Sequence, residues 1–374
     1  MKFTISKNLI ESTVEFLSSF VDNIDSFLPF RGIYIEIDNN EITFIGGSSS
    51  IAAKKTIKID EKNIKLDQTG RILINTQILK NLIKKFEKEI TFIKNDRTLE
   101  VFENKTKYTL TLLDETKYPH FNFSVSDTKV KIKSKDFSEA LNNAYISSNL
   151  GQDKNLSLTT NPVTKFINLK SEDKLLRFTS TDTFRLSTHV IDIETDLNID
   201  VNIDNKNFKK LYNKEMPEFI DLFFGSNKIG ISYHETVIFT HTSNIKYIDI
   251  SKLLEFDKKR FIKIKKDELS KVINKTVFAV ADKVKRLELS ISEKEIKATF
   301  EVPEIGVSEF MTTDFEYTGL SFEMDINWIF LKDAISAFNS EFIYLYINDE
   351  GNKIYILEDD NTNNIQLLTP IRKY

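Results

Sequence analysis

The chain has 374 residues, of which 40% are apolar and 29% charged, and its formal net charge is -4. This length exceeds one ordinary hydrophobic core and predicts two or three domains. The apolar share excludes a disordered chain, and no apolar run reaches the roughly 18–20 residues of a membrane helix. Since the first residues show no signal-peptide pattern, we expect a cytoplasmic protein.

The sequence offers few of the residues and motifs that form catalytic or metal sites. The sequence has no cysteine, which excludes disulfides, thiolate nucleophiles, zinc fingers and iron–sulfur clusters. The glycine-rich run at residues 45–50 lacks the G-K-[ST] ending of a phosphate loop and predicts a loop or bulge. No nucleophile elbow, kinase set or HExxH motif is present. We therefore expect no enzymatic activity, no cofactor and no metal. The four histidines, which show no metal-ligand spacing, are His120, His189, His234 and His241.

The first third of the chain alternates strands and helices. Residues 2–6 read as a strand, and apolar residues recur at helical spacing over residues 7–22. Residues 33–37 and 41–45 alternate as the strands of a hairpin. A second helix follows residues 72–75, and strands at 90–94, 98–103 and 107–113 close the segment.

This order then restarts twice, at residues 130–133 and at residues 261–264. The offsets of roughly 120–130 residues are those of a domain rather than of a solenoid unit. Two helices against many strands imply antiparallel sheet with helices on one face. We predict an α+β protein of three repeated domains, at residues 1–127, 128–258 and 259–374.

Lysines recur at four-residue spacing on the second predicted helix of the first and second repeats, and the first predicted helix of the third repeat carries two more. Such spacing places them along one side of a helix. A solvated charged face is the simpler interpretation for any one helix. The recurrence of the lysine rows in different repeats favours a function that these helices share. A row of ammonium groups suits contact with phosphates without base reading. The lysines are Lys80, Lys84 and Lys88 in the first repeat, Lys206, Lys210 and Lys214 in the second, and Lys271 and Lys275 in the third.

Two motifs carry a resemblance to a known family. S-T-D-T-F-R-L at residues 180–186 is similar to A-T-D-[GS]-H-R-L, and Q-L-L-T-P-I-R-K-Y at residues 366–374 is similar to Q-L-I-L-P-[VI]-R-T-Y. Both patterns belong to the β subunit of bacterial DNA polymerase III, the replicative sliding clamp. Further stretches also match the family: residues 1–4, residues 28–29 and residues 322–328. The resemblance therefore runs from Met1 to Tyr374.

The resemblance implies a DNA sliding clamp, or processivity factor, that encircles duplex DNA. Two protomers would close head to tail into a homodimeric ring with helices lining the hole. The clamp would be a non-catalytic subunit of a polymerase holoenzyme. It would tether the replicative polymerase, the clamp loader and other proteins that carry clamp-binding peptides. The lysines above and Gln152 would face DNA, and the dimer contact would set Tyr108 and Leu110 against Phe278.

The family's partner-peptide pocket would lie between the second and third domains. Apolar side chains with arginines and a lysine at the rim suit an apolar peptide with polar ends. Phe184 replaces the family's histidine, Thr369 a large apolar residue and Ile248 a proline, which implies an altered peptide preference. The residues implied by position are Leu158, Thr181, Thr183, Phe184, Arg185, Leu186, Ile248, Lys252, Leu253, Leu367, Thr369, Pro370, Ile371 and Arg372.

Two other functions remain as alternatives. A clamp-shaped adaptor could bind peptides without encircling DNA, and the lysines on the inner face would distinguish it from a clamp. An enzyme could assemble a site from distant carboxylates, but the missing nucleophile, metal cluster and phosphate loop disfavour this interpretation.

Overall fold

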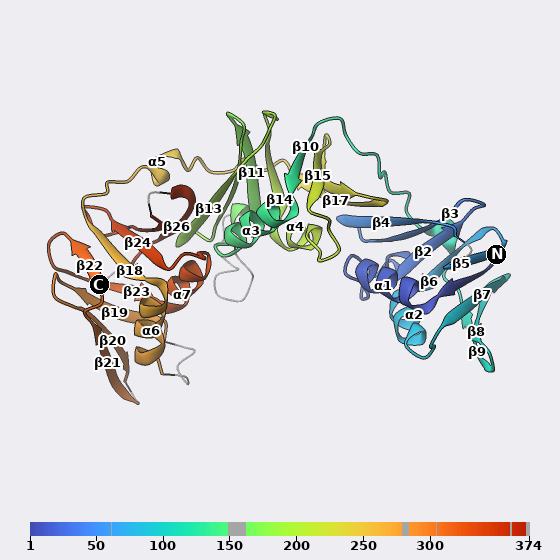
Figure 1. Ribbon diagram of the computed structural model, residues 1–374, viewed down its shortest axis with the longest axis horizontal. Coiled ribbons are helices and arrows are strands. Elements are labelled where there is room, and N and C mark those ends of the chain that lie inside the picture. Colours follow the sequence, from blue (N-terminus) through green and yellow to red (C-terminus); the bar gives the residue numbers. More distant parts are fainter. Residues whose placement is uncertain (61, 149–161, 279–283, 304, 360, 372–374) are drawn as a thin grey trace. The chain divides into compact units, whose positions relative to one another are not determined.

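The computed structural model (Figure 1) describes residues 1–60, 62–148, 162–278, 284–303, 305–359 and 361–371. The chain forms two compact units, Met1–Ser134 with Lys206–Ser243, and Lys135–Asn205 with Asn244–Tyr374. Within the described ranges, no helix is long and apolar enough to cross a membrane.

The elements follow the same order three times, except that the described residues of the second repeat have one strand fewer between the two helices. The first repeat contains β1 (Lys2–Ser6), α1 (Lys7–Ser18), β2 (Gly32–Ile37), β3 (Glu41–Gly47), β4 (Ile51–Lys58), β5 (Ile64–Gln68), β6 (Gly70–Asn75), α2 (Thr76–Ile83), β7 (Glu89–Asn95), β8 (Thr98–Glu103) and β9 (Thr106–Thr111). The second contains β10 (Lys129–Lys133), α3 (Ser134–Tyr145), β11 (Phe166–Glu172), β12 (Leu175–Thr181), β13 (Arg185–Asp192), β14 (Asp200–Asp204), α4 (Asn205–Leu211), β15 (Phe219–Phe224), β16 (Lys228–Tyr233) and β17 (Thr236–Ser243). After α5 (Ser251–Leu254), the third contains β18 (Phe261–Lys265), α6 (Lys266–Thr276), β19 (Arg286–Ile291), β20 (Ile296–Val302), β21 (Gly306–Thr312), β22 (Phe315–Thr318), β23 (Phe322–Asn327), α7 (Trp328–Ser336), β24 (Phe342–Ile347), β25 (Ile354–Glu358) and β26 (Asn361–Leu368).

Each repeat contains two antiparallel ladders of four strands. The first ladder is β1-β7-β8-β9 in the first repeat, β10-β15-β16-β17 in the second and β18-β24-β25-β26 in the third. The second ladder is β6-β2-β3-β4 in the first repeat, β14-β11-β12-β13 in the second and β23-β19-β20-β21 in the third. The prediction of an α+β fold built from three repeats is therefore confirmed, while the boundaries at residues 127/128 and 258/259 stay a prediction.

Ladders of neighbouring repeats join edge to edge inside each compact unit. In the first unit β4 pairs antiparallel with β17, and in the second unit β13 pairs antiparallel with β26. In both cases the last strand of one ladder in a repeat meets the last strand of the other ladder in the neighbouring repeat. Two strands of these types lie at sheet ends: β9 ends the sheet β5-β1-β7-β8-β9, and β21 ends the sheet β21-β20-β19-β23.

The helices pack their apolar faces on the sheets. In α1 the buried residues include Ile10, Val14 and Leu17, spaced as one helical face. The second helices of the first and third repeats begin at asparagine caps, because the side chain of Asn75 accepts the amide of Ile78 at 3.1 Å and that of Asn327 accepts the amide of Ile329 at 3.0 Å.

Two helices end earlier than predicted. The apolar pattern predicted a first helix to residue 22, but α1 ends at Ser18. Phe20 and Val21 are still buried, at 1% and 7% exposure, because the turn after the helix folds back onto the core. In the same way α2 ends at Ile83, before the buried Phe86.

Candidate functional site

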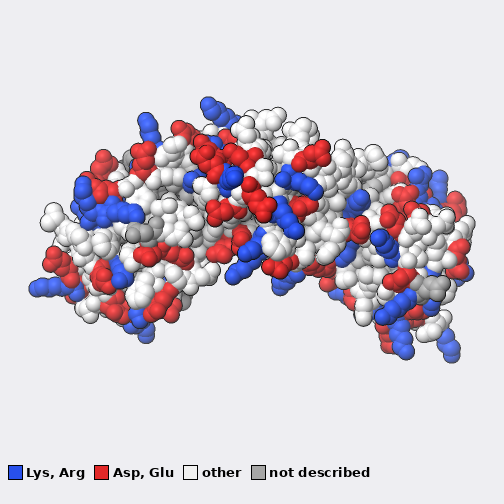
Figure 2. All heavy atoms as spheres, turned by 45° about the horizontal axis from the view of Figure 1, so that its top comes forward, with Lys and Arg blue, Asp and Glu red and all other residues white. Residues whose placement is uncertain are grey.

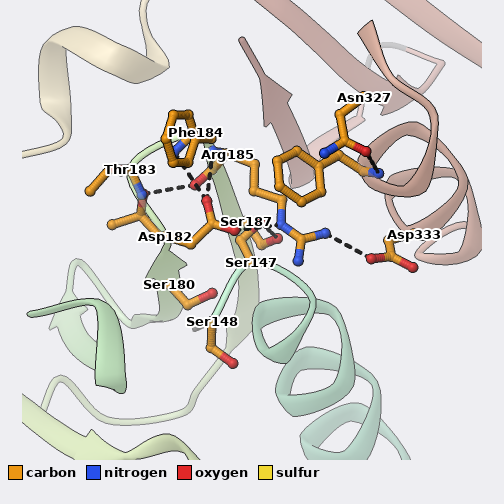
Figure 3. A network of polar contacts seen from close by, with 12 residues as sticks. Ser147, Ser148, Ser180, Asp182, Thr183, Phe184, Arg185, Ser187, Asn327 and Asp333 are labelled. Carbon is orange, nitrogen blue, oxygen red and sulfur yellow. Dashed lines mark hydrogen bonds and ion pairs between the residues drawn. The ribbon is translucent and has the colours of Figure 1, made fainter. Parts of the chain in front are cut away.

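The turn between β12 and β13 is fixed by one carboxylate. Oδ1 of Asp182 accepts the amides of Phe184 at 3.1 Å and Arg185 at 3.0 Å, while Oδ2 accepts Nε of Arg185 at 2.9 Å (Figure 3). Thr181 donates its hydroxyl to the carbonyl of Arg185 at 2.7 Å. These bonds hold Phe184 at the tip of the turn, with 47% of its surface exposed.

Arg185 lies inside the protein, which corrects the prediction that it stands at an open rim. Its exposure is 9%, and its Nη1 lies 2.8 Å from a carboxylate oxygen of Asp333 in α7. The guanidinium also lies 4.2 Å from the ring centre of Phe330. Figure 3 shows its ion pair with Asp333. Two carboxylates and an aromatic ring therefore contact the guanidinium of this arginine, which holds the turn against α7.

The C-terminal segment is tied to the same turn. Leu186 pairs with Leu367 across β13 and β26, and the carbonyl of Phe184 accepts both the amide of Thr369 at 3.0 Å and its hydroxyl at 2.8 Å. The predicted meeting of residues 181–186 with residues 367–371 is thus present in the structure. Beyond it, the amide of Ile371 donates to the carbonyl of Asp325 at 2.7 Å.

An apolar cluster lies under this junction. Leu186 and Leu367 belong to it, and Leu253 of α5 packs against it. Three of the predicted site residues are large apolar side chains that remain exposed: Phe184 at 47%, Ile248 at 37% and Ile371 at 37%. Lys252 is exposed in α5 and supplies a cation. We call the set Phe184, Ile248, Lys252, Leu253, Thr369, Pro370 and Ile371 the junction surface. The predicted site residues Leu158 and Arg372, like Gln152, lie outside the described residues.

The lysines predicted to line one side of a helix are arranged differently in the structure. The trio Lys80, Lys84 and Lys88 does not lie along one helix, because α2 ends at Ile83. Nζ of Lys80 lies 3.6 Å from Glu15 of α1. Lys84 and Lys88 are exposed beyond the helix.

The later repeats show a similar pattern. α4 ends at Leu211, so Lys206 and Lys210 lie in it while Lys214 follows it. Lys271 pairs with Glu268 at 3.0 Å, whereas Lys275 is exposed in the last turn of α6. Figure 2 shows basic and acidic side chains intermixed on the face that it presents.

The residues of the predicted dimer contact lie at or near the sheet ends. Tyr108 and Leu110 are on the end strand β9, and the ring of Tyr108 packs edge-on against Phe86 with centres 5.9 Å apart. The ring of Phe278, just after α6, lies 6.0 Å from that of Phe300 in β20. Both sites are half-buried and leave part of each ring accessible.

Three residues of the turn network were not among the predicted site residues: Asp182, Phe330 and Asp333. Asp182 could have been found, because aspartate before a turn commonly accepts amides two and three residues ahead. Asp333 and Phe330 carry no such signal, since they come from α7 and reach Arg185 only through the tertiary fold. Among the described residues, no group of three or more His, Cys, Asp or Glu side chains could hold a metal ion.

Comparisons with known proteins agree with this geometry. The sequence model of the DNA polymerase III beta subunit N-terminal domain matches residues 1–122, and that of its C-terminal domain matches residues 252–372. The beta sliding clamp of Mycoplasmopsis pulmonis is 25% identical over 379 residues, covering 100% of both chains. That of Bacillus subtilis is 22% identical, again over 100% of each chain.

Solved structures share the fold over the whole chain. The DNA polymerase sliding clamp of Bacillus subtilis superposes with a TM-score of 0.92 at 19% identity, and the DNA polymerase III beta chain of Streptococcus pneumoniae with 0.91 at 19%. Each covers 100% of both chains. The fold is that of a DNA sliding clamp. The chain belongs to the bacterial DNA polymerase III β subunit family.

Proposed function

We propose that this chain is a DNA sliding clamp, a processivity factor that encircles duplex DNA as a homodimer. The observation that carries the proposal is the match over the full length to sliding clamps in both sequence and fold. A ring holds DNA by topology, so a chain with net charge -4 needs only modest positive charge near the duplex. The role is non-catalytic and would place the protein in the cytoplasm with the replicating DNA.

The junction surface is the proposed docking site for partner peptides. Exposed Phe184, Ile248 and Ile371 offer apolar contact area, and exposed Lys252 offers a cation for a polar peptide end. The partners we propose are the replicative polymerase, the clamp loader and other DNA-handling proteins that carry short apolar-aromatic motifs.

The exposed lysines are the proposed phosphate contacts. Lys80 and Lys271 already have carboxylate partners within the fold, so they would contribute less than lysines in open solvent. Besides Lys271, the exposed lysines of the predicted set are Lys84, Lys88, Lys206, Lys210, Lys214 and Lys275. Since ammonium groups read no bases, the contact with DNA would be independent of sequence.

The clamp proposal is tested by retention on DNA. After loading by the cognate clamp loader onto nicked circular DNA, the protein should remain bound through gel filtration. Cutting the circle once with a restriction enzyme should release it, because a ring slides off an end. Equal loss from circular and linear DNA would contradict encirclement. Such loss with intact peptide binding would instead support a clamp-shaped adaptor that binds peptides only.

The docking proposal is tested at Phe184. Phe184→Ala should weaken binding of a fluorescent clamp-binding peptide from the cognate polymerase by about tenfold, because it removes a half-exposed aromatic contact. Fluorescence polarisation measures the affinity. Phe342→Ala is the matched control, since Phe342 lies in the same compact unit and is 37% exposed. Unchanged affinity in Phe184→Ala, or equal loss in both variants, would show that the junction surface is not the docking site.

A further inference from the structure

The chain contains two internal junctions between neighbouring repeats, and their residues can be matched. At the first junction β4 pairs with β17, and at the second junction β13 pairs with β26. Matching starts two residues before the end of the strand that precedes the second helix for the second ladder, and at the first residue of the first ladder. The equivalent steps are Leu73–Tyr34–Ile45–Lys54 and Asn202–Asn168–Thr179–Thr188 across the second ladder, and Lys129–Phe223–Gly230–Phe239 and Phe261–Tyr346–Tyr355–Leu367 across the first.

Both junctions have the same register. Lys54 pairs with Val237 at the first junction, and the equivalent Thr188 pairs with Ile365 at the second. In each case the partner lies two residues before the residue at which the step across the first ladder ends. Residues around the two junctions are therefore equivalent one by one.

The backbone contact that ties the C-terminal segment to the β12–β13 turn is repeated at the first junction. Counting on from the matched residues, His241 is equivalent to Thr369, and Ser50 is equivalent to Phe184. The amide of His241 donates to the carbonyl of Ser50 at 3.0 Å, and the amide of Thr369 donates to the carbonyl of Phe184 at 3.0 Å. The first junction thus has the same hydrogen bond as the junction that carries the junction surface.

The segments that connect the repeats are also matched, because each is fixed by a tyrosine. The hydroxyl of Tyr118 donates to the carbonyl of Ile45 at 3.3 Å, and that of Tyr247 donates to the carbonyl of Thr179 at 3.4 Å. Ile45 and Thr179 are equivalent in the second ladder. The residues after Tyr247 include Ile248, Lys252 and Leu253 of the junction surface. The residues after Tyr118 therefore take the same place at the first junction.

A cavity of about 550 Å³ lies at the first junction. It is lined by residues that follow Tyr118, by the turn between β15 and β16 and by the end of β17. Its volume lies within the range of about 300–1,000 Å³ that is typical of ligand pockets. We call it the first-junction cavity. Its aromatic and basic lining residues are His120, Phe121, Lys228, Phe239 and His241.

Phenylalanine rings form the apolar part of the first-junction cavity. The ring centre of Phe121 lies 6.4 Å from that of Phe239, and the ring centre of Phe123 lies 5.4 Å from it. Phe239 is buried, whereas Phe121 is only half-buried and leaves part of its ring accessible. An apolar side chain of a ligand would find contact area there.

The charges of the first-junction cavity favour an anion. Nζ of Lys228 donates to the carbonyls of Asn122 at 2.7 Å and Ser124 at 3.0 Å, which uses two of its three N–H groups. Burial lowers the pKa of Lys228, and a carboxylate in the cavity would oppose this shift. His120 and His241 are exposed and add imidazoles. Among the described residues that line the cavity, none is Asp or Glu.

We propose that the first-junction cavity binds a partner peptide that carries an acidic side chain beside an apolar one. The inference rests on the proposed docking function of the junction surface, whose backbone arrangement the first junction repeats. The two sites differ in chemistry, since the junction surface exposes Phe184 and Ile371 where the cavity offers imidazoles and an ammonium group. They therefore select different peptides, and one chain has docking sites for two kinds of partner.

Charge changes at Ser226 test the proposal on the full-length protein. Ser226 lines the cavity and is exposed in the β15–β16 turn, so its substitution leaves the core intact. The probe is the fluorescein-labelled peptide Gly-Asp-Leu-Phe-Asp-Gly, and fluorescence polarisation measures its affinity. Ser226→Glu should raise the dissociation constant about fivefold and Ser226→Lys should lower it about threefold, because the added charge repels or attracts the carboxylates. A neutral probe with Asn in place of Asp should respond to neither change.

Asn39→Glu and Asn39→Lys are the matched controls. Asn39 is exposed in the turn between β2 and β3 of the same compact unit and does not line the cavity. Both variants should bind the acidic probe as the unsubstituted chain does. Equal effects at Asn39 and Ser226 would overturn the proposal, because they would report only the net charge of the protein. Unchanged affinity in both Ser226 variants would overturn it as well.

Phe184→Ala separates the two sites. This variant should bind the acidic probe normally, since Phe184 belongs to the junction surface. Loss of acidic-probe binding in Phe184→Ala, with none in Ser226→Glu, would place the probe on the junction surface and overturn the second site. If the unsubstituted chain binds the polymerase peptide but not the acidic probe, the second site is overturned while the docking function of the junction surface stands.

Discussion

Arg185 shows where single residues escape prediction from sequence. The motif correctly placed this residue at the turn, but it did not show that the guanidinium is buried between Asp182 and Asp333. Asp333 lies 148 residues away in the chain, so only the fold brings the two together. A substitution at Arg185 would leave carboxylates without their cation, and any loss of peptide binding would report a distorted turn rather than a lost contact.

Thr183 carries backbone strain at the tip of the same turn. Its φ is 79°, in the left-handed region that β-branched residues avoid. Thr183→Gly should therefore raise the free energy of unfolding by about 1 kcal/mol, because glycine adopts this conformation without steric cost. Urea denaturation measures the change. The control Thr318→Gly, at an exposed strand position, should lower stability. A decrease in both variants would show that the turn is not strained.

At the scale of elements, local patterns predicted the hairpins and the presence of the helices, because alternation and helical spacing reflect which face is buried. Helix ends were predicted less well. Phe20 and Phe86 extend the apolar pattern past α1 and α2, since turns can bury apolar side chains as well as helices do. The pairing of β13 with β26 has no local signal and was not predicted, since the resemblance implied only that the two segments share a pocket.

Strand β13 also carries a half-buried histidine that should couple stability to pH. Burial lowers the pKa of His189 below its ordinary value of 6.5, although the charges of Glu358 and Asp136 oppose this shift. Asn143 approaches its Nδ1 at 3.0 Å. The unfolded chain binds a proton near pH 6.5 and the folded chain does so only at lower pH. Stability should therefore fall as pH drops below about 6.5, by up to about 1.4 kcal/mol per pH unit.

The urea midpoint measured from pH 7.5 to pH 5.5, about one unit either side of that value, checks this dependence. His189→Gln should reduce the slope, whereas His234→Gln, at an exposed position, should leave it unchanged. The same slope in His189→Gln as in the parent protein would assign the effect to other groups.

At the scale of the whole molecule, the distribution of charge bears on how the protein would stay on DNA: by closure of a ring or by contacts of lysines with phosphates. Positive residues are interspersed with acidic ones, and two of the predicted DNA-facing lysines are paired within the fold. A protein held by several phosphate contacts would lose affinity by orders of magnitude between about 50 and 200 mM salt. A closed ring on circular DNA should instead keep nearly the same half-life over this range. A steep salt dependence on circular DNA would show that the lysines, not closure, hold the protein.

The pairing of β26 with β13 also affects the order in which the protein can fold during synthesis. The ribosome makes β13 before β26, so the edge of β13 that pairs with β26 stays open until β26 has been made. The carbonyl of Phe184 likewise lacks its donors until Thr369, 185 residues further along the chain, has been made. A product truncated before β26 therefore lacks the junction surface even when the preceding repeats are folded.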